Sequence, residues 1–143
     1  MDAVALCENL DTLRLDSDDD DALDALLDRV AEAGYPPETL VAMLHVLENN
    51  PDHDFGAPGD LVRAIEMRWL DDGYFSALID SVHRRPTEYN LWLMNRIMNT
   101  FDEGDMLRRG IAVFHQVEAE STDEVIKSVA RDFIDYFDDQ PER

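Results

Sequence analysis

Residues 86–101 read PTEYNLWLMNRIMNTF, a stretch that surrounds Asn95, Arg96 and Asn99 with Trp92 and many other apolar side chains. At about 100° per residue, the apolar side chains leave free only the arc near Asn95 and Asn99. A helix covered on one side by its own domain does not need so much apolar surface. We therefore predict a central helix that is packed on most sides. Because an unpaired buried amide costs about 1–3 kcal/mol, we expect Asn95 and Asn99 to bond backbone groups of an adjoining loop.

Helical patterns also fill the chain on both sides of this stretch. Apolar residues at helical spacing occur in residues 18–34, 36–51, 61–70, 74–84, 103–120 and 121–139. Gly34 suits the end of the first of these segments, and Thr87 is the expected N-cap of residues 86–101. No run of alternating apolar and polar residues indicates a strand. The predicted fold class is all-α: a single domain over residues 1–143 of six to eight short antiparallel helices, in a HEAT-like or irregular helical bundle. We expect the acidic segment 1–21 to be partly mobile.

Spacing also predicts individual faces and caps. Two apolar faces recur at every fourth residue: Leu61, Ile65 and Trp69 in residues 61–70, and Val125, Val129, Phe133 and Phe137 in residues 121–139. We expect Asp60 to cap the first of these helices, and Ser121 and Glu124 to form a capping box at the start of the second.

The charge of the chain limits the classes of partner. There are 33 acidic and 12 basic residues, a net charge of −21, and residues 1–60 alone hold 16 acidic and two basic residues. Such a surface repels phosphate backbones and anionic lipid headgroups, so we predict neither nucleic acid nor membrane as a partner. No window approaches the roughly 18 apolar residues of a membrane span, and the acidic N-terminus does not resemble a signal peptide. The single cysteine, Cys7, fits a reducing compartment, so we expect a cytoplasmic protein.

No residue pattern predicts catalysis or a metal centre. Asp16 and Asp18 begin a run that resembles half of an EF-hand, but Asp21 stands where the loop needs glycine and Leu27 where it needs glutamate. The four histidines are scattered singly, without metal-ligand spacing, which leaves open only a site assembled in three dimensions. With 33 acids in the chain, close carboxylate pairs arise by chance and carry no information on acid–base chemistry. We therefore predict a protein that is not an enzyme and needs no cofactor.

Two motifs in the middle of the chain carry a family resemblance. One is the turn made by Phe55, Gly56, Ala57, Pro58 and Gly59; the other comprises Pro86, Thr87, Trp92, Asn95, Arg96 and Asn99. Over about 45 residues this pattern resembles a family of small helical immunity proteins that are encoded beside bacterial polymorphic toxins, including those of contact-dependent inhibition. Arg63 stands where the family often has histidine, so no role is assigned there. Both motifs look structural, marking a tight turn and a packed helix.

The resemblance implies that the protein binds and neutralises a cognate toxin domain, by occluding its active site or blocking an essential movement. The acidic surface favours a basic toxin, such as a nuclease whose site must attract phosphate. The candidate partner-binding residues are Asp18, Asp19, Asp20, Asp21, Asp52 and Asp54, and the alternative is that they form an ordinary solvated surface. A second hypothesis is an acidic helical adaptor or scaffold for a non-toxin protein, which an exposed groove would favour. An acidic hydrolase would need a pocket of convergent carboxylates with strongly shifted pKa values. The oligomeric state stays open.

Overall fold

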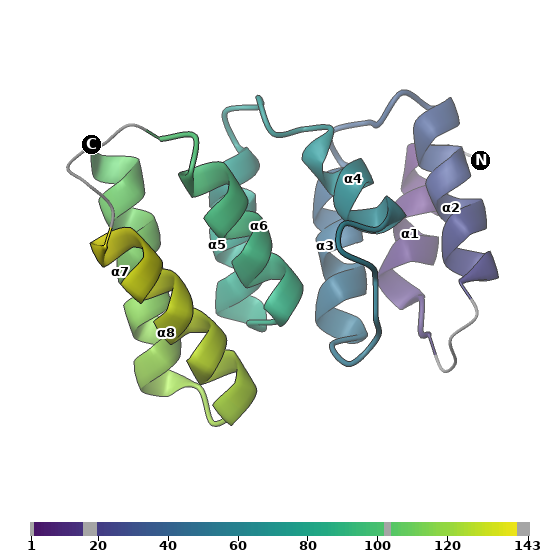
Figure 1. The fold of residues 1–143 in the computed structure, drawn as a ribbon. Coiled ribbons are helices and arrows are strands. Elements are labelled where there is room, and N and C mark those ends of the chain that lie inside the picture. The colour runs from purple at the N-terminus through teal and green to yellow at the C-terminus, as the bar shows by residue number, and fades with distance from the viewer. Residues whose placement is uncertain (1, 16–19, 102–103, 140–143) are drawn as a thin grey trace. The chain divides into compact units, whose positions relative to one another are not determined.

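The computed structural model describes residues 2–15, 20–101 and 104–139, and its regular secondary structure there is entirely helical (Figure 1). The described helices are α1 (Ala3–Thr12), α2 (Asp21–Glu32), α3 (Thr39–Asn49), α4 (Asp60–Glu66), α5 (Tyr74–Arg84), α6 (Glu88–Met98), α7 (Asp105–Glu120) and α8 (Glu124–Asp138). Eight helices and no strand in the described residues confirm the all-α prediction. Within that part of the chain, no helix is both long and apolar enough to cross a lipid bilayer.

The chain divides into two compact units, Met1–Ala77 and Leu78–Arg143, with the boundary inside α5. The single domain and the HEAT-like arrangement of the helices stay predictions. In the acidic segment 1–21, residues 3–12 form α1, whereas residues 16–19 lie outside the described part.

The first unit is built around α3. This helix is buried on nearly all sides, through Leu40, Ala42, Met43, Leu44, Val46 and Leu47. Helices α1 and α4 both pack against α3, and α2 packs against α1 and α4. Each of these neighbours contributes fully buried apolar residues, such as Leu6 and Leu10 from α1. The most thoroughly packed helix of this unit is therefore α3.

Gly34 ends α2, as predicted. At φ 79° it occupies the left-handed region, which glycine enters without a steric penalty. The Gly34 amide donates to the Ala31 carbonyl at 3.0 Å, and the Tyr35 amide donates to the Val30 carbonyl at 2.9 Å. These two bonds form a Schellman motif and satisfy carbonyl groups at the end of the helix.

Helix α4 is shorter than the apolar pattern predicts. It ends at Glu66, so Trp69 falls in the following turn and is 46% exposed, away from the face of Leu61 and Ile65. The N-cap is Gly59, and Asp60 lies in the first turn without a side-chain capping bond. The predictions for Trp69 and for the Asp60 cap were therefore wrong, because a spacing of four residues does not reveal where a helix stops.

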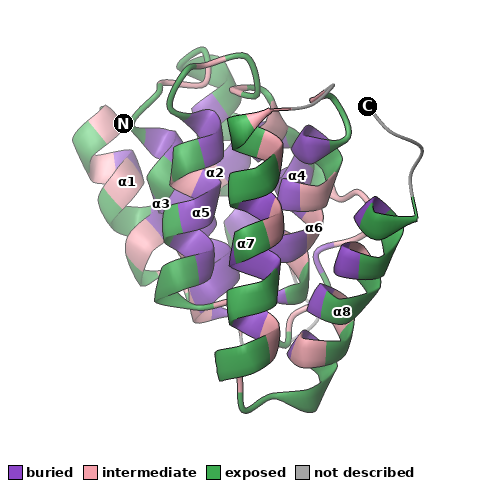
Figure 2. Cartoon of the chain, turned by 90° about the vertical axis from the view of Figure 1, so that its left-hand side faces the viewer, coloured by how far each residue is buried: buried purple, intermediate pink, exposed green. Residues whose placement is uncertain are grey.

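In the second unit, α7 and α8 pack against each other and against α6. The Phe114 ring of α7 lies 5.6 Å from the Phe133 ring and 6.4 Å from the Phe137 ring, both on α8. The buried residues of α8 are Ile126, Ala130, Ile134 and Phe137. In Figure 2 the buried residues of α8 line its edge towards α7, and exposed residues line the opposite edge.

Two predictions for α8 were wrong. Val125 is 57% exposed. The buried residues Ile126, Ala130 and Ile134 each follow a residue of the predicted face by one position, and only Phe137 belongs to both faces. The N-cap is Asp123, whose carboxylate accepts bonds from the amides of Val125 at 2.9 Å and Ile126 at 3.3 Å. Ser121 instead ends α7, and its hydroxyl accepts a bond from the Asp123 amide at 3.1 Å. The hydrogen-bonded carboxylate of the N-cap Asp123 replaces the expected capping box.

Candidate partner-binding surface

Carboxylates gather around the start of α2 in the first unit. Asp21 and Asp24 lie in the first turn of α2 and are exposed. Partial desolvation, together with the carboxylates of Asp20, Asp60, Asp21 and Asp28, raises the pKa of Asp24 above its usual value. Desolvation is the largest cause of this shift, and the four neighbouring carboxylates add to it. Of the predicted binding residues, the structure thus brings Asp20 and Asp21 into one acidic cluster.

Asp20 also has a structural partner. Its Oδ1 atom and His53 Nε2 lie 2.6 Å apart and share a hydrogen bond, and the His53 side chain is only 8% exposed. The His53 ring also stands edge-on to the Phe55 ring, with centroids 4.7 Å apart. Asp20 therefore joins the start of α2 to the loop that precedes α4, in addition to contributing negative charge.

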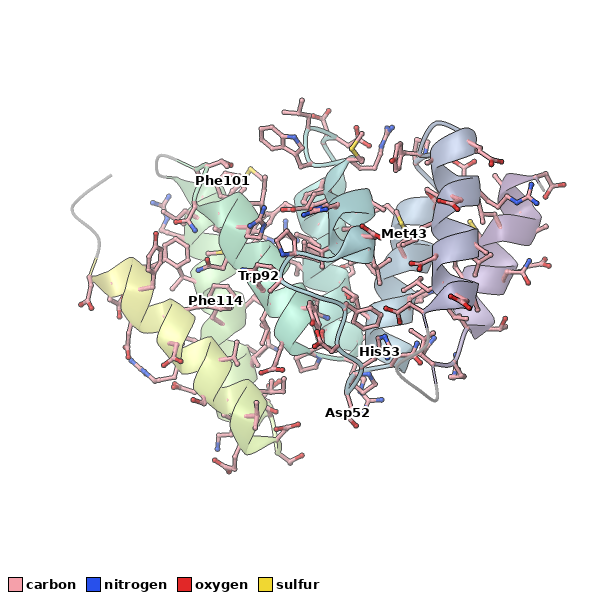
Figure 3. The ribbon with its side chains drawn as sticks, turned by 45° about the vertical axis from the view of Figure 1, so that its right-hand side comes forward. Met43, Asp52, His53, Trp92, Phe101 and Phe114 are labelled. Atoms are coloured by element: carbon pink, nitrogen blue, oxygen red, sulfur yellow. The ribbon has the colours of Figure 1, made fainter. Side chains whose placement is uncertain are left out.

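The other predicted binding residues differ in their surroundings. Asp52 is exposed, and Figure 3 places it at the outer end of the loop, with His53 nearer the helices. The Asp54 carboxylate accepts a bond from the Gly56 amide at 2.9 Å, so it stabilises the turn that follows. Asp18 and Asp19 lie outside the described residues.

Long-range polar contacts that no sequence pattern predicts hold α1 and the segment after it in place. His45 Nδ1 and Asp11 Oδ1 lie 2.7 Å apart and share a hydrogen bond. Asn50 is buried; its carboxamide accepts a bond from the Leu15 amide at 2.7 Å and donates to the Leu13 carbonyl at 3.1 Å. The partners are more than 30 residues apart in the sequence, so no local spacing identifies them.

The first motif of the family resemblance forms a tight turn. Phe55 is buried, Gly56 adopts φ 92°, and the peptide bond between Ala57 and Pro58 is cis. A Cβ atom on Gly59 would lie 1.5 Å from the Phe55 carbonyl oxygen, so only glycine fits there. The geometry gives Phe55, Gly56, Pro58 and Gly59 a structural role at the entrance to α4.

The second motif contains a buried hydrogen-bond network at the start of α6. Thr87 is the N-cap, as predicted, and its hydroxyl accepts a bond from the Asn90 amide at 3.1 Å. The Asn90 carboxamide accepts a bond from the Thr87 amide at 2.7 Å and donates to Ser81 Oγ at 3.1 Å and to the Arg85 carbonyl at 2.9 Å. Asn90 is fully buried, although it is not among the residues predicted from the motif. Pro86, next to Thr87, lines the groove described below.

The part of α6 that is accessible to solvent is larger than the predicted arc near Asn95 and Asn99. Most apolar side chains of this helix are buried, but Arg96 is exposed and Trp92 only partly covered, with the guanidinium 5.3 Å from the centre of the indole ring. The Asn99 amide donates to the Asn95 carbonyl of the same helix at 2.9 Å, and its oxygen accepts from the Tyr136 hydroxyl at 2.8 Å. These two bonds of Asn99 run to α6 and to α8, so the expected bond from Asn99 to an adjoining loop was wrong.

An open groove of about 360 Å³ lies in the second unit. Residues from α5 (Val82, His83) and α7 (Gln116, Val117) line it. Glu120 is the one carboxylate among the lining residues, so the groove lacks the convergent carboxylates that the hydrolase hypothesis requires.

In the described part of the chain, no group of three or more His, Cys, Asp or Glu side chains could hold a metal ion. Burial and the nearby carboxylates of Asp11 and Glu38 raise the pKa of the Cys7 thiol, which disfavours the reactive thiolate. Comparisons with protein-family models, with curated proteins and with solved structures found no match.

Proposed function

We propose that this chain is an immunity protein, which binds a cognate bacterial toxin domain in the cytoplasm and neutralises it. The observation that carries the proposal is the concentration of negative charge in residues 1–77, which hold 19 acidic and four basic residues. Desolvation and the neighbouring carboxylates of Asp20, Asp60, Asp21 and Asp28 raise the pKa of Asp24, so negative charges face one another in this cluster. A basic partner would relieve that repulsion, so the arrangement favours binding to a positively charged protein.

The proposed mechanism requires no chemistry from this chain. Electrostatic attraction accelerates the encounter, and a stable complex then occludes the active site of the toxin or blocks an essential movement. A nuclease is a suitable partner because its own site must be basic in order to bind phosphate. The producing cell and its siblings are protected for as long as the complex lasts.

The residues of the two motifs have a structural role in the proposal, because they position helices. The turn from Phe55 to Gly59 positions α4, and the Asn90 network positions α6. Neither motif is assigned to the contact with the toxin. The proposed contact residues are the acidic cluster of Asp20, Asp21, Asp24 and Asp60, with Asp52 on the adjoining loop.

Co-expression tests the proposal directly. A toxin domain encoded beside the gene should arrest growth when expressed alone, and this protein should restore growth. The association rate with the purified domain should fall about tenfold or more when the salt is raised from about 50 to about 500 mM. An association rate indifferent to salt would remove the electrostatic part of the proposal, and a failure to restore growth would remove the function.

Paired charge variants locate the contact. Replacing Asp21 and Asp24 together by Asn should slow association several-fold, because both belong to the acidic cluster. The matched control replaces Asp132 and Asp138, two exposed carboxylates of α8, and removes the same charge from the other unit. Equal effects of the two pairs would mean that net charge acts without a local contact.

The groove in the second unit favours the alternative function, an adaptor for a non-toxin protein. Its lining combines apolar Val82 and Val117 with polar His83 and Gln116, the mixture of apolar and polar groups that ligand sites share. If this function is correct, no toxin domain is neutralised. A non-toxin partner should then lose affinity when the exposed Gln116 is replaced by Arg.

A further inference from the structure

The turn that joins α4 to α5, which Figure 1 shows at the end of α4, carries three exposed large apolar side chains. Met67 is 57% exposed, Trp69 46% and Leu70 76%. We call these three residues the apolar turn. Single apolar residues scattered over a protein surface are normal. Here, however, Met and Trp are exposed together in one short turn, and both residue types are enriched at the centres of protein–protein interfaces.

The conformation of the apolar turn is held in place by the one basic residue inside it. Arg68 Nε donates to the Asp71 carboxylate at 2.6 Å, and Nη1 donates to the Tyr35 carbonyl at 3.3 Å. Backbone bonds from Trp69 to Glu66 and from Asp71 to Arg68 fix the chain on either side. The Arg68 side chain is only 25% exposed, so the turn presents apolar groups outward and keeps its cation inward. Such pre-organisation reduces the entropy lost on binding.

Charge decides which occupant fits the apolar turn. Asp71 and Asp72 follow it directly, and the unit to which it belongs carries a net charge of −15. A second copy of this chain, an anionic membrane or a nucleic acid would bring further negative charge and be repelled. A protein surface with basic groups around an apolar hollow is complementary in both respects.

We propose that Met67, Trp69 and Leu70 are apolar anchors in the contact with a basic protein domain. The inference rests on the proposed function, in which that domain is the toxin. The acidic residues of the first unit set the rate of association, whereas the apolar turn sets the lifetime of the complex, because buried aromatic anchors act mainly on dissociation.

The test uses the full chain and the purified toxin domain encoded beside the gene. Trp69→Ala should weaken binding at least tenfold and Leu70→Ser several-fold. In both variants the dissociation rate should rise, and the salt dependence of the association rate should change little. Val125→Ser on α8 is the matched control, since Val125 is also 57% exposed, and it should leave binding unchanged. Equal urea midpoints of all variants will show that folding is intact. Binding by Trp69→Ala and Leu70→Ser within twofold of the unsubstituted protein would overturn the inference and leave the proposed function standing.

The remaining outcomes separate the two proposals further. If the unsubstituted protein does not bind the toxin domain, the proposed function fails and the inference fails with it. Sedimentation of the free protein as a dimer that Leu70→Ser dissociates would assign the apolar turn to a second copy. Binding to neutral phosphatidylcholine vesicles that Trp69→Ala abolishes would assign it to a lipid surface. Either of these two results overturns the inference.

Discussion

Gly59 illustrates how one residue determines a local structure. The chain turns so tightly after Phe55 that a Cβ atom on Gly59 would lie 1.5 Å from the Phe55 carbonyl oxygen and 2.7 Å from its carbon. These are backbone atoms, so no side-chain rotation could relieve the overlap. The φ angle of Gly59 is −98°, which any residue can adopt, so the constraint is space and not backbone conformation.

We predict that Gly59→Ala destabilises the protein by more than about 3 kcal/mol, because the backbone of the turn must move to admit the methyl group. Gly73→Ala is the matched control, because a Cβ atom there meets nothing within 4 Å. It should change stability by less than about 1 kcal/mol. Urea unfolding followed by circular dichroism measures both variants. A Gly59→Ala protein within about 1 kcal/mol of the unsubstituted one would contradict the tight contact.

Other contacts of single residues could not be predicted from the sequence. The turn formed by Gly56 and Gly59 was predicted because glycine and proline act locally. The hydrogen bonds from His53 to Asp20 and from His45 to Asp11 join residues 33 and 34 positions apart. Their pairing depends on how the helices pack, which no local pattern contains.

At the scale of the element, α8 shows the limit of periodicity. Its apolar residues fall on two adjacent stripes, one through Val125 and Val129 and one through Ile126 and Ala130, which differ by about 100° around the helix. The second stripe is buried against the rest of its unit. Spacing predicts that a helix forms, but its neighbours decide which stripe they cover. Helix α1 was not predicted because it buries only Leu6 and Leu10, and so gives a weak pattern.

The cap of α8 provides a test at this scale. Asp123→Ala should destabilise the protein by about 1 kcal/mol, because the amides of Val125 and Ile126 lose their acceptor. Glu124→Ala should change stability by no more than about 0.5 kcal/mol, because Glu124 is an exposed residue of the first turn. Urea unfolding of the two variants makes the comparison. A larger effect at Glu124 than at Asp123 would restore the capping box with Ser121.

At the scale of the whole molecule, the negative charge is divided unevenly between the two units. Residues 1–77 carry a net charge of −15 and residues 78–143 a net charge of −6. This imbalance is readable from the sequence alone. The assembly of Asp20, Asp24 and Asp60 into one cluster is not, because Asp60 comes from a different helix. The cluster links the stability of the free protein to pH.

The raised pKa of Asp24 sets the sign of that dependence. A carboxyl group whose folded pKa exceeds its unfolded value, 3.8, binds its proton more tightly in the folded state. Its contribution to stability is fully present below the unfolded pKa and is lost as the pH rises through the folded pKa. At neutral pH the charged Asp24 therefore opposes folding, and Asp24→Asn should raise the free energy of unfolding. The gain should be below about 1 kcal/mol, since the residue is exposed and screened by solvent.

Urea unfolding near pH 7 and near pH 3.5 checks this prediction. The gain from Asp24→Asn should be present at the higher pH and absent at the lower one, and added salt should reduce it near pH 7. Asp72→Asn is the matched control. Asp72 is an exposed carboxylate of the same unit, but it is not among the groups that raise the pKa of Asp24. An equal gain from Asp72→Asn would assign the effect to net charge. A loss of stability in Asp24→Asn near pH 7 would mean that the dipole at the start of α2 outweighs the repulsion.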